Sequence, residues 1–302
     1  MDPDRRAPPR GVLDVLHRLG LLVVTCALAA PARAAGIRLV EAETLPLASP
    51  QFVEPVAVAV GPLGQLFLAD LGLGTVVRLD SSASIVFEFE SPATRPDMQP
   101  LDLEVTGFQV YVLDAGANAL LRFSDEGSLL DVLQSFQEEG VETPRAVSVD
   151  GTGRVLLANP ARHTARIVNE AQVTETAVGG FGTRAGELSY PSGVAFAPDG
   201  SFYVADTGNG RIQRFSGVGN YEEALFEALV EPRGLAVGAR GEVYAADAEA
   251  HAVHVFGPHP GQHTALELAG KTPADVAVLG DTLWVLSIEP VELIRVRVVR
   301  GE

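Results

Sequence analysis

Apolar and polar positions alternate in six short segments of the chain, each of which begins with a proline. Three and five places after the proline stand apolar residues, as Val194 and Phe196 do in the fourth segment. Alternate positions lie on one face of a β-strand. A turn that contains glycine comes next, and a second strand follows with a large residue, such as Tyr203, near its middle. The pattern predicts paired β-strands, and no segment has the spacing of a long amphipathic helix.

The six segments are copies of one repeating unit. They begin at Pro55, Pro100, Pro144, Pro191, Pro232 and Pro273. Their second strands end at Asp70, Asp114, Asn159, Asp206, Asp247 and Ser287. Nine residues further on, every copy has an apolar residue that we expect to end a third strand: Leu79, Phe123, Val168, Phe215, Phe256 and Val296. The starts are 41 to 47 residues apart, which leaves room for a fourth strand and is typical of a propeller blade or a solenoid repeat.

Six such units predict an all-β fold over residues 35–302, a six-bladed β-propeller with four antiparallel strands in each blade. The sixth unit stops soon after its third strand, at residues 292–299. Residues 37–47 precede the first unit and belong to none. We expect them to supply the missing outer strand of the last blade, because this closure removes an exposed sheet edge.

The amino terminus has the three parts of a secretory signal peptide, which we assign to residues 1–34. Four arginines precede twelve mostly apolar residues at 19–30, and an Ala-Arg-Ala sequence then provides a cleavage site. The only cysteine, Cys26, lies in this segment, where the sequence faintly resembles a lipobox. Thr25 departs from the small residue of that motif, so cleavage is favoured over lipidation. We expect a secreted or periplasmic protein without disulfides and without a transmembrane segment in the mature chain.

The excess of acidic over basic residues argues against one class of partner, the nucleic acids. The chain has 22 Lys and Arg against 39 Asp and Glu, a formal net charge of −17. Phosphate backbones are bound mainly by Lys and Arg, so we expect no nucleic-acid partner. We expect the chain to be a monomer.

The fourth unit, residues 181–215, closely resembles the NHL repeat. The matching elements are the Pro-Ser-Gly-Val-Ala strand from Pro191, an Asp-Gly turn, a Tyr-Val-Ala-Asp strand, and Asn209 and Arg211 before the third strand. The fifth unit matches well, whereas the others are degenerate and none of them keeps both Asn209 and Arg211 equivalents. The resemblance implies a propeller that serves as a binding platform, and it implies no particular reaction.

Three acidic residues stand at positions of the repeat where the other units have small side chains. Asp102 and Asp275 stand two places after the proline, where other units have Ala or Gly, and Glu104 stands in a column of Ala and Ser. The first strand of a blade is innermost, so these side chains are predicted to lie near the central channel. Units two and six flank unit one in a closed ring. Two or three converging carboxylates there can hold a hard cation such as Ca²⁺.

Two arginines follow the proline directly, Arg145 in unit three and Arg233 in unit five. One interpretation is a pair of inter-blade ion pairs with Asp102 and Asp275. The other is a channel mouth with acidic and basic sides, which suits a zwitterionic or partly anionic ligand.

Two further groups have a structural and a functional interpretation. The six polar residues that end the second strands, Asp70 and its equivalents, form either a cation site or a set of acceptors for backbone N–H groups, and we favour the latter. The four histidines at 251, 254, 259 and 263 can bind zinc, but their spacing favours a solvated loop. These four are His251, His254, His259 and His263. His163 is predicted to lie near a turn on the face of the polar ring.

The sequence therefore favours an exported, non-catalytic binding or scaffold propeller for a protein, glycan or small-molecule ligand. It contains no recognised catalytic motif. The alternative is a metal-dependent lactonase- or lyase-type propeller enzyme, as the gluconolactonases, paraoxonases and virginiamycin B lyases are. Its site would be the central channel, with Asp102, Glu104, Asp275 and His163 as the available groups.

Overall fold

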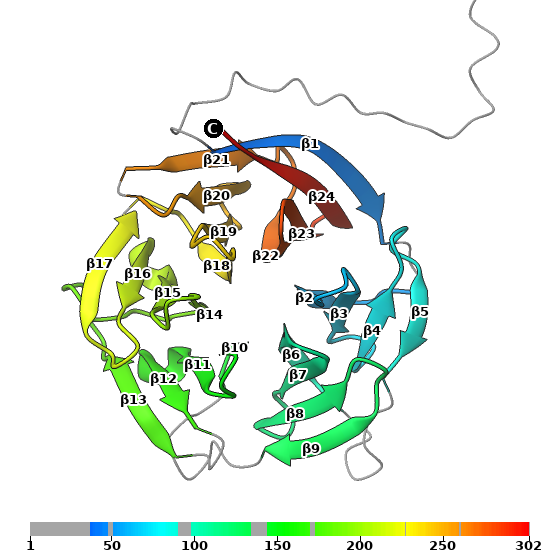
Figure 1. Cartoon of the computed structure of the whole chain (residues 1–302), viewed down its shortest axis with the longest axis horizontal. Helices are drawn as coiled ribbons and strands as arrows, with labels where there is room; N and C mark the ends of the chain where they lie inside the picture. The colour runs from blue at the N-terminus through cyan, green and yellow to red at the C-terminus, as the bar shows by residue number, and fades with distance from the viewer. Residues whose placement is uncertain are drawn as a thin grey trace, which may run out of the picture. The chain divides into compact units, whose positions relative to one another are not determined.

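Six four-stranded antiparallel sheets, the blades, stand in a ring (Figure 1) in the computed structural model. The structure describes residues 37–47, 51–89, 98–133, 144–169, 173–226, 228–259 and 261–301. The predicted six-bladed all-β propeller is confirmed. The signal peptide predicted at residues 1–34, with Cys26, lies outside the described residues.

The strands follow one another outward from the centre of the ring. The first strands are β2 (Pro55–Val60), β6 (Pro100–Thr106), β10 (Ala146–Val149), β14 (Gly193–Phe196), β18 (Pro232–Val237) and β22 (Pro273–Leu279). The second strands are β3 (Leu66–Asp70), β7 (Gln109–Asp114), β11 (Val155–Asn159), β15 (Phe202–Asp206), β19 (Val243–Asp247) and β23 (Thr282–Ile288). The third strands are β4 (Thr75–Leu79), β8 (Ala119–Ser124), β12 (Thr164–Val168), β16 (Arg211–Phe215), β20 (Ala252–Phe256) and β24 (Val291–Arg300). The outer strands are β5 (Ile85–Glu88), β9 (Leu129–Leu133), β13 (Thr174–Gly179), β17 (Tyr221–Phe226), β21 (His263–Glu267) and β1 (Ile37–Pro46). Short 3₁₀ turns follow two second strands: η1 (Pro160–Arg162) and η2 (Thr207–Asn209).

The second strands do not alternate between buried and exposed residues, as a strand with one face in solvent does. Every residue of β3, β11, β15 and β19 is buried. Each blade packs between two neighbours, so both faces of its middle strands are covered. The hydrophobic core therefore consists of the layers between blades.

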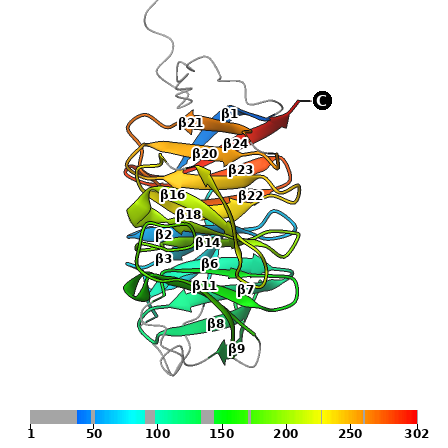
Figure 2. The same ribbon diagram turned by 90° about the vertical axis from the view of Figure 1, so that its left-hand side faces the viewer.

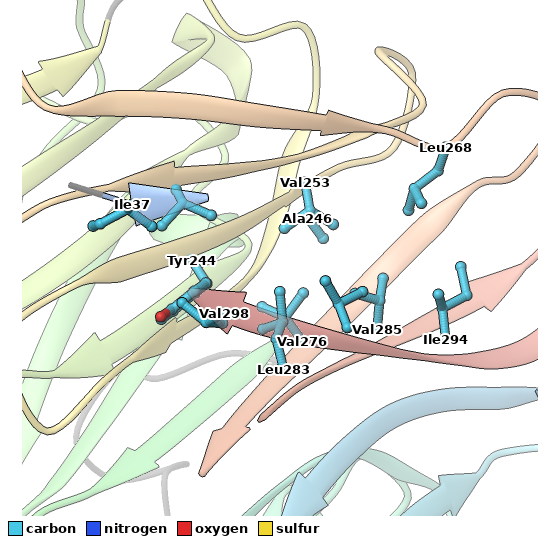
Figure 3. Packing of buried hydrophobic residues seen from close by; sticks show 12 residues of the cluster. Ile37, Tyr244, Ala246, Val253, Leu268, Val276, Leu283, Val285, Ile294 and Val298 are labelled. Carbon is cyan, nitrogen blue, oxygen red and sulfur yellow. The ribbon is translucent and has the colours of Figure 1, made fainter. Parts of the chain in front are cut away.

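The amino-terminal strand closes the ring, as predicted. β1 pairs antiparallel with β24, from Ile37 opposite Arg300 to Pro46 opposite Glu292. Figure 2 shows β1 (blue) and β24 (red) side by side. Ile37 also packs into the core layer between blades 5 and 6, together with Tyr244 and Val298 (Figure 3). The two ends of the propeller are thus joined in one sheet, which leaves no unpaired edge on β24.

The polar residues that end the second strands are structural. Asp70 accepts backbone N–H bonds from Val53 and Glu54, which lead into the first strand, and from Leu73 in the turn to β4. Asp114 and Asp247 do the same in their own blades, and all three are essentially inaccessible. The structural interpretation of this ring is confirmed for these blades.

Blade 4 adds side-chain donors to the same arrangement. Asp206 accepts hydrogen bonds from Asn209 (2.8 Å), from Arg211 Nε (2.7 Å) and from Gln213 (3.0 Å), in addition to the backbone N–H of Ser189. Arg211 in turn donates to the backbone carbonyls of residues 183, 184 and 187. The two residues that mark the NHL pattern thus hold the loop before blade 4 against a buried carboxylate.

Glycine permits a close approach of the inner strands. A Cβ at Gly193 would overlap the carbonyl oxygen of Arg233 in the next blade, and one at Gly234 would overlap Asp275. These glycines set how near blades 4, 5 and 6 come to one another around the centre.

We predict that Gly193→Ala destabilises the fold by about 1–3 kcal/mol, because a backbone carbonyl cannot move aside without shifting a strand. The matched control is Gly151→Ala, since that Cβ would meet no atom within 4 Å. Urea unfolding of both variants measures the difference. Equal stabilities would show that the inner strands are not in close contact.

Candidate functional site

A central channel runs through the ring of blades. Its volume is about 1110 Å³, and all six first strands line it. Arg145 and Arg233 lie at the end where the prolines enter the blades, and Asp150 and Asp199 lie at the turns of the opposite end. Asp102, Glu104 and Asp275 line the channel between these ends, as the sequence predicted.

Asp102 and Asp275 are equivalent residues, and they make equivalent contacts. The Asp102 carboxylate accepts the backbone N–H of Val147 in blade 3 (2.7 Å), and Asp275 accepts that of Val58 in blade 1 (2.8 Å). Asp102 also accepts the N–H of Leu103 in its own strand (2.9 Å). Each aspartate therefore joins the inner strand of one blade to that of the next.

Glu104 extends this connection across a third blade. Its carboxylate accepts the N–H of Val105 (3.0 Å) and the hydroxyl of Ser148 in blade 3 (3.2 Å). The Ser148 oxygen accepts the N–H of Phe196 in blade 4 (3.1 Å). Sequence analysis did not single out Ser148, although it is one of the two polar residues in a column of alanines.

The three carboxylates hold protons more tightly than ordinary acids. Each faces the channel but is half-buried among the inner strands. Burial raises the pKa of Asp102 to about 7, against opposing hydrogen bonds from Val147 and Leu103. Burial, followed by the charge of Asp102, raises the pKa of Glu104 to about 7. Burial and the same aspartate raise the pKa of Asp275 well above its usual range. The carboxylates of blades 2 and 6 are thus close enough for their charges to interact, and near neutral pH the group exchanges protons.

The two arginines do not form the inter-blade ion pairs that one interpretation expected. Arg233 pairs with Glu231 of its own blade (2.9 Å). Among the described residues, Arg145 forms no ion pair with Asp102, although its positive charge lowers the pKa of that carboxyl slightly. Arg145 is exposed at the channel end where the prolines enter. The arrangement is a channel with carboxylates inside and arginines at one mouth.

The carboxylates do not form a chelating group. Within the part of the chain that the structure describes, no three His, Cys, Asp or Glu side chains lie together in a way that holds a metal ion. Since the oxygens of Asp102 already face backbone N–H donors, they are oriented toward the neighbouring blade. The geometry therefore does not support the predicted Ca²⁺ site.

The histidines lie outside the channel lining. His163 follows η1, and its Nδ1 accepts the backbone N–H of Tyr190 (3.1 Å). His254 and His263 share a hydrogen bond (2.9 Å) with stacked rings, and burial lowers the pKa of both. His259 and His263 line a separate cavity of about 510 Å³ between blades 4 and 5. The Nδ1 atom of His251 lies 2.7 Å from the carbonyl oxygen of Lys271.

Comparisons with known proteins agree with this architecture. The family model of the NHL repeat matches residues 188–215 and 229–256, in blades 4 and 5. A comparison with curated protein sequences found no match.

Solved structures of similar fold include two lyases and a candidate gluconolactonase. A catalytically inactive virginiamycin B lyase from Staphylococcus aureus, in which one histidine is replaced by alanine, has a TM-score of 0.66 at 13% identity, over 85% of this chain and 99% of that one. A streptogramin B lyase has a TM-score of 0.62 at 16% identity, over 90% of each chain. The candidate gluconolactonase has a TM-score of 0.66 at 18% identity, over 86% of this chain and 94% of its own. At these identities the likeness establishes the fold alone.

The repeat matches fall in two adjacent blades. The other four blades have the same strand order, and two of them have the same buried acid at the end of the second strand, Asp70 and Asp114. The chain is a six-bladed β-propeller that carries NHL repeats in blades 4 and 5.

Proposed function

We propose that this protein is an exported, non-catalytic binding propeller whose central channel receives a small ligand with a positively charged group. The observation that carries the proposal is the set of three coupled carboxylates inside a channel of about 1110 Å³, with two arginines at one mouth. A cationic group of the ligand would stabilise the ionised carboxylates, and Arg145 would pair with an anionic group. A zwitterion meets both requirements.

The fold likeness to lyases and a candidate gluconolactonase favours a second candidate, an enzyme of the channel. In the virginiamycin B lyase named above, replacing one histidine gives a catalytically inactive protein. The described residues that line the channel here include no histidine, and they offer no chelating trio for a metal-dependent lactonase. These two features support binding over catalysis.

The proposed export rests on the signal peptide that the sequence predicts at residues 1–34. The described residues contain no helix that is long and apolar enough to span a membrane. Outside the cytoplasm, a propeller of this kind would act on small molecules, glycans or proteins of the cell exterior.

The first test concerns the protons of the channel. Because the folded-state pKa of Glu104 is raised to about 7, its contribution to stability is present below about pH 4 and is lost as the pH rises through about 7. Glu104→Gln removes the charge while keeping a partner for Ser148. We expect this variant to exceed the wild type by less than about 1 kcal/mol at pH 5 and by about 1–3 kcal/mol at pH 8, after allowance for water in the channel.

Denaturant unfolding at pH 5 and pH 8 measures this difference. The control is Glu88→Gln, since Glu88 is an exposed carboxylate on β5. A Glu104 variant that behaves like the Glu88 variant at both pH values would show that Glu104 is an ordinary acid.

The second test separates the two candidate functions by thermal melting of the purified, EDTA-treated protein. We expect no rise in Tm with Ca²⁺ or Zn²⁺, and a rise with arginine or phosphocholine that is larger at pH 8 than at pH 6 and absent in Glu104→Gln. A ligand at 100 times its Kd stabilises the fold by about 2.7 kcal/mol. A rise with Ca²⁺ that Asp102→Asn abolishes would instead support the metal-dependent enzyme. No response to any of the four probes would remove the channel as a site for charged ligands.

The third test addresses export. Expression of the full chain with N-terminal sequencing of the product outside the cytoplasm should give Ala35 as the first residue. A product that begins at a modified Cys26 would show lipidation, and an intact Met1 in the cytoplasm would contradict export.

A further inference from the structure

Three aromatic side chains form a surface cluster between blades 3 and 4, at the face where the prolines enter. They are His163, Phe181 and Tyr190, here called the aromatic cluster. The His163 ring centroid lies 4.8 Å from that of Phe181 and 4.5 Å from that of Tyr190. Phe181 is 73% exposed and Tyr190 is 59% exposed. Two large rings are thus presented to solvent around a central imidazole.

The backbone holds these rings in place at a cost in strain. Tyr190 has φ of 47° and His163 has φ of 55°, the left-handed region that side chains with a Cβ rarely adopt. The strain is balanced by hydrogen bonds: Tyr190 N donates to His163 Nδ1 (3.1 Å), and Gly180 N donates to the His163 carbonyl oxygen (2.8 Å).

The neighbouring backbone is equally fixed. Ser189 N donates to the buried Asp206 (2.6 Å), and Gly208 N donates to the Ser189 carbonyl oxygen (2.8 Å). At Gly179 a Cβ would lie 2.6 Å from the His163 carbonyl oxygen, so β13 comes close to the backbone of His163. The cluster is therefore pre-organised, and a ligand would not have to order it.

The chemistry of the cluster combines flat apolar faces with a few hydrogen-bonding groups. Because Nδ1 of His163 accepts the N–H of Tyr190, the neutral ring carries its proton on Nε2, which can donate. The Tyr190 hydroxyl can donate or accept. A sugar ring has complementary features, since its C–H face is apolar and packs on aromatic rings, while its hydroxyl groups need polar partners at the edge.

The surroundings of the cluster favour a small neutral ligand. Thr183 and Arg184 beside Phe181, and Arg162 beside His163, are exposed and polar. A stable protein interface buries about 800 Å² on each partner, which two exposed rings within a polar rim do not supply. A net charge of −17 opposes polyanions.

We propose that the aromatic cluster is a docking site for a neutral carbohydrate, separate from the central channel, which takes one or two sugar units of a longer chain. Neither Phe181 nor Tyr190 lines the channel. The sugar would stack on Phe181 and Tyr190 and accept a hydrogen bond from His163 Nε2. Such a site would hold the propeller on a glycan while its channel remains open.

Isothermal titration of the purified protein with chitohexaose, cellohexaose and maltohexaose tests this site. We expect at least one of these neutral hexasaccharides to bind with a Kd of about 1 mM or tighter. Phe181→Ala and Tyr190→Asn should each weaken binding about fivefold or more. Asparagine is chosen at 190 because it tolerates the left-handed backbone.

The matched control is Phe108→Ala, because Phe108 is also 59% exposed but lies in the β6–β7 turn at the other end of the blades. It should bind as the wild type does, and the melting temperatures of all variants should confirm folding. If no hexasaccharide binds at 10 mM, or if the Phe181 and Tyr190 variants bind like the Phe108 variant, the proposal is wrong. Binding of a decaproline peptide, but not of the sugars, that is lost in Phe181→Ala would replace the carbohydrate by a peptide segment and also overturn it.

Discussion

The fold depends on an interaction that blades 1, 2, 4 and 5 share: a buried carboxylate at the end of the second strand accepts backbone N–H groups of the segment entering its blade. In blade 1, Asp70 bonds both Val53 and Glu54, and in blade 5 Asp247 bonds Val230 and Glu231. Both carboxylates are inaccessible to solvent, so the loss of these N–H donors would leave a buried charge without partners, which is costly. The interaction fixes where the first strand begins in these four blades, and all six first strands line the channel.

Aspartates on the first strand of a blade also accept backbone N–H groups, but they face the channel. Asp102 and Asp275 also accept backbone N–H groups, but those of the next blade, and they stand in the channel together with Glu104. Burial raises the pKa values of all three acids, and the charge of Asp102 raises those of Glu104 and Asp275 further. The aspartates that join blades 2 and 6 to their neighbours are therefore also residues that bind protons in the channel and that can bind a cation there. Structural and binding roles do not exclude each other here.

Most of the architecture could be predicted because it is periodic. The repeat revealed the blades, the closing strand at 37–47 and the buried role of Asp70 and its equivalents, and departures from the repeat identified Asp102, Glu104 and Asp275 as channel residues. The partners of these acids could not be predicted, since the aspartates bind backbone N–H groups of the next blade, Val147 for Asp102 and Val58 for Asp275. The expected inter-blade ion pairs were wrong for this reason, because backbone N–H groups occupy the aspartates instead. The aromatic cluster was missed because it depends on two left-handed residues that no sequence pattern marks.

The most direct test of the central claim is a carbon-13 NMR titration of the side-chain carboxyl groups between pH 4 and pH 9, with Glu104→Gln and Asp102→Asn used for assignment. The account predicts that Asp102 and Glu104 titrate with midpoints of about 7 and that Asp275 titrates well above its usual range. Removal of the Glu104 charge should lower the midpoints of the other two, since the three charges are coupled. Midpoints below about 5 for all three groups, or independent titrations in the variants, would contradict a shared ionisable centre in the channel.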